Sequence, residues 1–168
     1  MQFTAAVLTV SDSSASGKRQ DLSGPAIRAA LEAKGFHVVV SSLVTDDQPD
    51  IEVAILELCH QAQLVVTTGG TGIAERDVTP EATRSVADKI VEGIAERMRS
   101  EGARYTPLSA LSRGVCAVRG RSLILNLPGS PAAAEQSLGA VIDILPHALE
   151  LLAGKTSHGA TKQDQRSR

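Results

Sequence analysis

Apolar residues along this 168-residue chain follow two patterns in turn, one typical of strands and the other of helices. Short runs rich in valine, leucine and isoleucine predict buried strands. These runs lie at residues 4–10, 36–44, 63–68, 115–118 and 123–127. Apolar residues spaced three and four positions apart predict helices between the strands. These helices begin near Pro25, Pro49, Pro80 and Pro131, with another at about residues 92–101. A late proline, Pro146, should break the last helix.

The order of the predicted elements is β-α-β-α-β, which favours an α/β fold with a mostly parallel sheet and helices on both faces. The predicted domain covers residues 1–153, and a polar loop rich in serine and glycine runs to about Ser23. Residues 154–168 are polar and lack periodicity, so they are predicted to form a flexible tail.

Composition narrows the classes of protein to which the chain can belong. A net charge of −2, 2% aromatic residues and no tryptophan argue against a nucleic-acid partner. No stretch approaches the ~18 apolar residues that a membrane span needs, so no membrane partner and a cytoplasmic location are expected. Cys59 and Cys116 lie far apart, which predicts buried free thiols.

The segment Thr68–Gly72 follows the third predicted strand and consists of glycine and threonine. Glycine allows the backbone to approach a ligand closely, and amides near a helix start attract anions. Asp77 follows the segment, and Thr79 and Pro80 are predicted to cap and open the next helix. A carboxylate beside an anion suggests a bridging cation, so a metal–phosphate site is predicted. Because the spacing matches neither of the common phosphate-binding glycine motifs, a simple tight turn is an equal alternative.

Four loops follow predicted strands, and ligands of open parallel sheets bind where such loops meet. The loops contain Ser11-Asp12, Asp46-Asp47, Thr68–Gly72 with Asp77, and Pro128-Gly129-Ser130. Two carboxylates from different loops could hold Mg²⁺ against a polyphosphate, because Mg²⁺ prefers oxygen ligands and shares them with phosphates. Each loop also has a purely structural alternative, since Asp and Ser are common at turns and helix caps.

Three segments carry a family resemblance: TVSDSSASGKRQDLSGPAI, LVVTTGGTGIAERDVTPEAT and LILNLPGSPAAAEQ. In this order and spacing they resemble the MogA/MoaB proteins of molybdenum cofactor synthesis, a group that includes the gephyrin G domain. The resemblance spans roughly residues 4–152. It implies a three-layer α/β/α fold, a homotrimer and a molybdopterin adenylyltransferase. Such an enzyme uses MgATP to adenylate the terminal phosphate of molybdopterin and releases pyrophosphate, and its product would pass to a molybdate-inserting enzyme.

The resemblance also implies roles for individual residues. Asp46 and Asp77 match acidic positions that the family uses for catalysis, either through Mg²⁺ or by activating the transfer. The positions that match substrate-binding or nucleotide-binding segments are Ser11, Asp12, Thr68, Gly69, Gly70, Thr71, Gly72, Pro128, Gly129 and Ser130. The implied reaction is in-line attack by the molybdopterin phosphate on the α-phosphorus of ATP.

An alternative within the same family is a catalytically inactive protein of the MoaB type that binds molybdopterin or acts as a scaffold. Some members are thought to lack adenylyl transfer, and their RDVTP segment is altered. Here the segment Asp77-Val78-Thr79-Pro80 stands as in the active pattern, which favours the enzyme.

Overall fold

Six strands form one mixed sheet at the centre of the computed structural model, which describes residues 2–155. The strands are β1 (Thr4–Val10), β2 (His37–Val44), β3 (Leu64–Thr68), β4 (Lys89–Ile90), β5 (Cys116–Arg119) and β6 (Ser122–Leu127). Their order across the sheet is β2-β1-β3-β6-β5-β4. The first four in this order are parallel, and β5 and β4 run antiparallel to their neighbours. The mostly parallel sheet is therefore confirmed.

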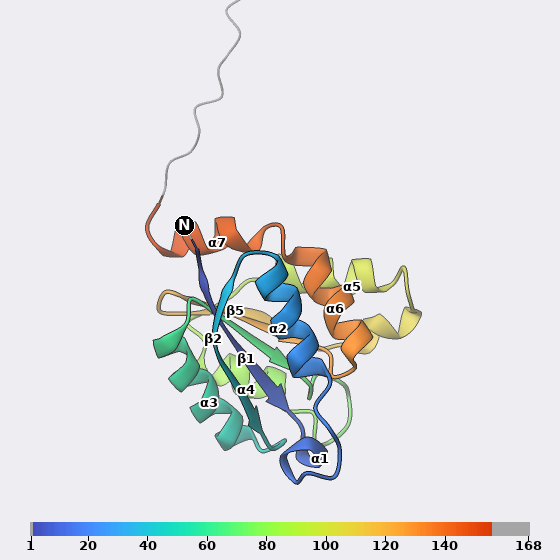
Figure 1. Cartoon of the computed structure of the whole chain (residues 1–168). Coiled ribbons are helices and arrows are strands. Elements are labelled where there is room, and N and C mark those ends of the chain that lie inside the picture. The colour runs from blue at the N-terminus through green and yellow to red at the C-terminus, as the bar shows by residue number, and fades with distance from the viewer. Residues whose placement is uncertain (1, 156–168) are drawn as a thin grey trace, which may run out of the picture.

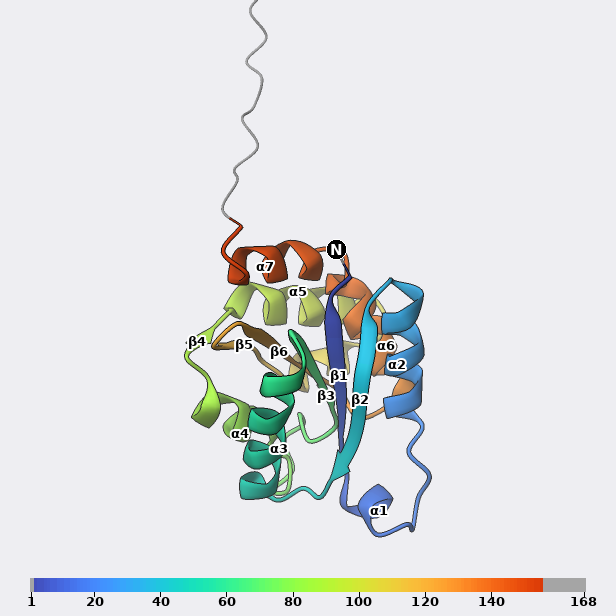
Figure 2. The same ribbon diagram turned by 60° about the vertical axis from the view of Figure 1, so that its left-hand side comes forward.

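Helices cover both faces of this sheet, which gives the predicted three layers (Figure 1). One face carries α2 (Ser23–Ala33), α5 (Glu92–Gly102), α6 (Pro131–Val141) and α7 (Leu145–Leu152). The other face carries α3 (Gln48–Gln61) and α4 (Thr79–Val86), on the opposite side of β1 and β3 from α2 and α6 in Figure 2. Among the described residues, no helix is both long and apolar enough to cross a membrane.

Side chains of alternating direction on each strand build the two cores. On β1, Ala5 and Val7 pack toward α2 and α6, while Ala6 and Leu8 pack toward α3. All five residues of β3 are buried, because this central strand is covered on both faces. This explains why the inner strands β3 and β6 are rich in apolar residues and contain no charged side chain.

Two short helices and one short strand were not predicted. Helix α1 (Asp12–Ala15) interrupts the loop that was expected to run to about Ser23, and the 3-10 helix η1 (Pro107–Leu111) and β4 are also new. The Ser11 hydroxyl accepts a hydrogen bond from the Ser14 amide at 3.2 Å and so caps α1. Apolar periodicity cannot predict such helices, because side-chain caps hold their first turns.

The end of the predicted domain falls near the limit of the described residues. The expected break at Pro146 is confirmed, since α6 ends at Val141 and α7 begins at Leu145 with the proline in its first turn. Of the predicted tail, residues 156–168 lie outside the described residues.

Candidate functional site

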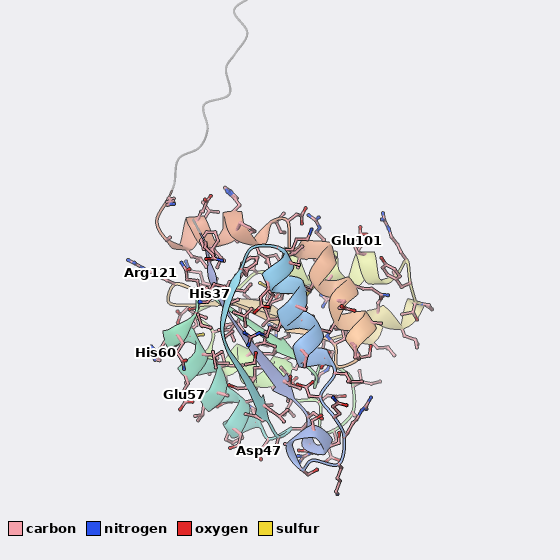
Figure 3. All side chains as sticks on the ribbon, viewed as in Figure 1. His37, Asp47, Glu57, His60, Glu101 and Arg121 are labelled. Carbon is pink, nitrogen blue, oxygen red and sulfur yellow. The ribbon has the colours of Figure 1, made fainter. Side chains whose placement is uncertain are left out.

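The carboxyl ends of β1, β2, β3 and β6 lie at one edge of the sheet, and the four predicted loops meet there. In Figure 3, Asp47 lies at this end of the molecule near α1, and His37 and Arg121 lie toward the other end. The register of the sheet places the last residues of these strands side by side. Val10 pairs with Val44, and Thr68 pairs with Leu127.

A polar cavity of about 290 Å³ opens between these loops. Eight of the residues predicted to form the site line it, and they come from all four loops. They are Ser11, Asp46, Thr68, Gly69, Gly70, Asp77, Gly129 and Ser130. The two predicted catalytic carboxylates, 31 positions apart in the chain, therefore face the same space.

A second cavity of about 390 Å³ adjoins the first and is richer in apolar side chains. Met98, Leu108 and Leu111 are among its walls. The predicted residues Thr71, Gly72 and Pro128 line this cavity and not the polar one. Gly70, Asp77 and Gly129 line both, so the two cavities meet at these residues.

The segment Thr68–Gly72, called the glycine segment below, contains two backbone conformations that other residues rarely adopt. Gly69 has φ +106° and Gly70 has φ +65°. A Cβ atom at Gly69 would lie 2.2 Å from the carbonyl oxygen of Val10 at the end of β1. The Gly69 amide donates to the Leu127 carbonyl at 3.1 Å. The glycine at this position is thus required for packing between strand ends.

Two threonines, Thr68 at the start of the glycine segment and Thr79 after it, hold the segment in place. The Thr68 hydroxyl donates to the Pro128 carbonyl at 2.7 Å and ties the segment to the loop after β6. The prediction that the Thr79 side chain caps α4 is wrong, because the buried Thr79 hydroxyl donates to the Gly69 carbonyl at 2.9 Å. Val78 occupies the cap position without a side-chain hydrogen bond. A nearby backbone carbonyl has displaced the local capping contact.

Asp77 lies in a tight turn before α4. Its Oδ2 accepts a hydrogen bond from the Ala74 amide at 2.9 Å, and its own amide donates to the Ala74 carbonyl at 2.9 Å. A Cβ atom at Gly72 would lie 2.7 Å from the same Oδ2. The carboxylate of Asp77 therefore lies directly against the glycine segment.

Asp46, in the loop before α3, exchanges hydrogen bonds with Asp12 in the loop after β1. Asp46 Oδ2 accepts from the Asp12 amide at 2.8 Å, and Asp12 Oδ1 accepts from the Asp46 amide at 2.9 Å. Asp12 Oδ2 also accepts from Arg76, at 2.6 Å to Nη2. Burial raises the pKa of Asp46, and the negative charges of Asp12 and Asp77 add to this effect. The Asp46 amide and then Arg76 lower the pKa of Asp12.

Asp12 is the one predicted binding residue that lines neither cavity. Its carboxylate contacts the Asp46 amide and Arg76, so its observed contacts support the neighbouring loop. Ser130 has a structural role in addition to its place in the polar cavity. Its hydroxyl accepts from the Ala133 amide at 3.3 Å and caps α6, as predicted.

The carboxylates fit a magnesium ion that is shared with a phosphorylated ligand. Within residues 2–155, no group of three or more His, Cys, Asp or Glu side chains could hold a metal ion. Mg²⁺ in nucleotide sites is typically held by one or two carboxylates plus phosphate oxygens and water. Asp46 and Asp77, which face the same polar cavity, supply a donor set of that kind.

Several arginines of the site were missed in the sequence. Arg19 lines the polar cavity, and Arg99 lines the apolar one and donates to the Gly114 carbonyl at 3.1 Å. Arg113 contacts the glycine segment and Asp77. Arg76 stands next to Asp77 in the resembling segment, so a signal for it was present. Arg19 also lies in a resembling segment, whereas Arg99 and Arg113 lie in segments with no recognisable motif.

Comparison with known proteins gives the chain a family. A model described as "Probable molybdopterin binding domain" matches residues 6–147. The molybdopterin adenylyltransferase of Helicobacter pylori strain J99 is 41% identical over 155 residues, which cover 88% of this chain and 86% of that protein. The Escherichia coli K12 protein of the same name is 38% identical over 168 residues, with 88% and 84% covered.

Solved structures agree with this assignment. The molybdopterin biosynthesis enzyme MoaB of Thermus thermophilus is 51% identical with a TM-score of 0.87, covering 92% of this chain and 98% of that one. The molybdopterin biosynthesis Mog protein of Mycobacterium ulcerans is 39% identical with a TM-score of 0.84, covering 92% and 99%. The chain described here belongs to the molybdopterin-binding family that includes the MogA and MoaB proteins.

Proposed function

We propose that this protein is a molybdopterin adenylyltransferase of molybdenum cofactor biosynthesis. MgATP is the adenylyl donor, the terminal phosphate of molybdopterin is the acceptor, and pyrophosphate leaves. Curated relatives of that name at about 40% identity support this activity. The observation that carries the proposal is that Asp46 and Asp77, from loops after different strands, face one polar cavity beside the glycine segment.

The two adjoining cavities suit a reaction between two bound substrates. Because Gly70, Asp77 and Gly129 line both cavities, we place the reacting phosphates at this boundary. The acceptor phosphate attacks the α-phosphorus of ATP in line with the leaving pyrophosphate. Phosphoryl chemistry of this kind depends on positioning and charge stabilisation, so the residues need not form a covalent intermediate.

Groups that line the two cavities have parts in this reaction. Asp46 and Asp77 would hold Mg²⁺, which supplies charge neutralisation on the phosphates when it is bound. The glycine segment keeps side chains out of the space where the backbone meets the substrates. Arg19 and Arg99, one in each cavity, offer positive charge to phosphate oxygens.

The test is direct assay of the purified protein with molybdopterin and MgATP, measuring adenylated molybdopterin and pyrophosphate. We expect the wild-type protein to form both products. Asp77→Asn keeps an acceptor for the Ala74 amide but removes the charge, so it should lose at least about 10²-fold in kcat while molybdopterin binding is retained. The matched control is Asp143→Asn, which removes a surface carboxylate paired with Arg97 at 3.0 Å.

Two outcomes would contradict the proposal. Wild-type protein that binds molybdopterin without forming product would support the non-catalytic alternative. Full turnover by Asp77→Asn would remove Asp77 from the reaction. The homotrimer implied by the family resemblance is a separate part of the proposal, and light scattering should give three times the chain mass of 17.5 kDa.

A further inference from the structure

Arg113 lies outside both cavities, yet it contacts both ends of the segment that carries Asp77. Its Nε donates to the Gly72 carbonyl at 2.7 Å, and its Nη2 donates to the Asp77 carbonyl at 2.5 Å. Its backbone amide donates to the Thr71 carbonyl at 2.8 Å. One side chain therefore bridges the two ends of residues 72–77.

A carboxylate on α4 orients this guanidinium group. Arg113 Nη1 forms an ion pair with Glu81 Oε1, and Nη2 lies 3.4 Å from Glu81 Oε2. The two side chains are 38% and 43% exposed, so the ion pair itself should add little to the free energy of unfolding. Its consequence is geometric, because it fixes the plane of the guanidinium relative to the first turn of α4.

The shape of the guanidinium matters more than its charge at this position. A planar fork can donate to two carbonyls and a carboxylate at once, whereas a lysine ammonium is a single point at the end of a flexible chain. A Cβ atom at Gly72 would lie only 2.7 Å from Asp77 Oδ2, so the Gly72 backbone and the Asp77 carboxylate are in close contact. A shift of the Gly72 backbone would therefore change the position of the carboxylate relative to the glycine segment.

We propose that Arg113 is a positioning residue, which holds the Asp77 carboxylate at the boundary of the two cavities by clamping the carbonyls of Gly72 and Asp77. This inference rests on the proposed function, in which Asp77 acts in adenylyl transfer. Arg113 takes no part in binding substrate. A displacement of about 1 Å in a catalytic group can lower the rate about 10²-fold, so the clamp is expected to act on kcat.

The decisive variant is Arg113→Lys, which keeps the charge and the pairing with Glu81 but cannot reach both carbonyls. We expect kcat to fall about 10²-fold, with KM for ATP and for molybdopterin changing by less than about threefold. Amide hydrogen exchange of residues 72–77 should become faster, because local opening of this segment becomes easier. Glu81→Gln leaves both carbonyl contacts in place and should lose less activity than Arg113→Lys.

The matched control is Arg119→Lys. Arg119 is 45% exposed and pairs with Asp88 at 3.3 Å, and it lies in the hairpin before β6, at the opposite end of that strand from the site. The Arg119→Lys substitution should change neither kcat nor the amide hydrogen exchange of residues 72–77.

The measurements separate the competing explanations. Unchanged kcat and exchange in Arg113→Lys would overturn the proposal, as would a rise in both KM values at constant kcat. A loss of activity that only follows lower thermal stability, with faster exchange throughout the chain, would also overturn it, because Arg113 would then be merely structural. If the wild-type protein transfers no adenylyl group, the proposed function fails, and exchange of residues 72–77 still decides whether Arg113 holds the segment.

Discussion

Asp12 and Asp46 accept hydrogen bonds from each other's backbone amides, at 2.9 and 2.8 Å, across 34 residues of sequence. This reciprocal pair joins the loop after β1 to the loop after β2. Arg76 balances the charge of Asp12, which leaves Asp46 as the carboxylate that faces the polar cavity. The pair therefore divides the work between a supporting aspartate and an aspartate of the site.

Replacement of Asp12 by alanine should lower activity, although Asp12 lines neither cavity. The Asp46 amide loses its acceptor in Asp12→Ala, so the Asp46 loop becomes less restrained. We expect a lower urea midpoint and a loss of about tenfold in kcat. Asp47→Ala is the control, because Asp47 makes no capping hydrogen bond to α3. Equal effects of the two substitutions would show that the reciprocal pair has no special role.

The pH dependence of activity should differ from that of stability. Burial raises the pKa of Asp46, so the ionised form needed in the site is lost at a pH above the ordinary aspartate value of about 4. The folded state favours the protonated form of Asp46. The contribution of Asp46 to the free energy of unfolding is therefore fully present below the ordinary aspartate pKa, and it is lost as the pH rises through the raised pKa of the folded state. We expect the acid limb of kcat/KM, which reports the free enzyme, to lie above pH 4.

Asp12 and Glu81 have the opposite sign. The Asp46 amide lowers the pKa of Asp12, and Arg113 lowers the pKa of Glu81. Their contributions to stability are present above the ordinary carboxyl pKa and are lost as the pH falls through the lowered values. Circular dichroism should therefore show folded protein at pH values where activity has already fallen. Activity and the folded signal that fall together would contradict this assignment for Asp46.

Most of the fold was predictable because burial on both faces leaves a strong sequence signal. The residues of β3 are all buried, so the strand consists of three apolar residues and two threonines, with no charged side chain. The meeting of four loops followed from strand direction alone, since parallel strands end at the same edge. Asp46 and Asp77 could be placed together on these grounds before their contacts were known.

The remaining features depend on tertiary contacts that leave no local pattern. Thr79 was expected to cap α4, but its hydroxyl donates to the Gly69 carbonyl, ten residues away in sequence. Arg113 lies before β5 and reaches Asp77 only because the chain returns to the glycine segment. Long side chains of this kind carry no spacing signal, so their role emerges only from the folded structure.

Both cysteines should be unreactive in the folded protein. Burial raises the pKa of Cys59 to about 11 and that of Cys116 to about 12, and both thiols are free. At pH 8 only about one Cys59 side chain in 10³ would be a thiolate, which is the reactive form. We expect slow alkylation by iodoacetamide under native conditions and rapid alkylation of both in urea, measured by mass spectrometry. Cys116 is buried as predicted, whereas Cys59 is only half-buried, so rapid native labelling of Cys59 would contradict the raised pKa of its thiol.

Substitution of Gly69 by alanine should be among the most damaging single changes in the glycine segment. Gly69 has φ +106°, and an added Cβ would lie 2.2 Å from the Val10 carbonyl oxygen. We expect Gly69→Ala to lower the free energy of unfolding by about 3 kcal/mol or more, measured by urea titration, and to abolish transfer. Gly35→Ala is the matched control, since Gly35 has φ +86° with nothing within 4 Å of its Cβ position. It should cost only about 1 kcal/mol. Equal costs would mean that backbone strain alone, and not close packing between strand ends, requires glycine at position 69.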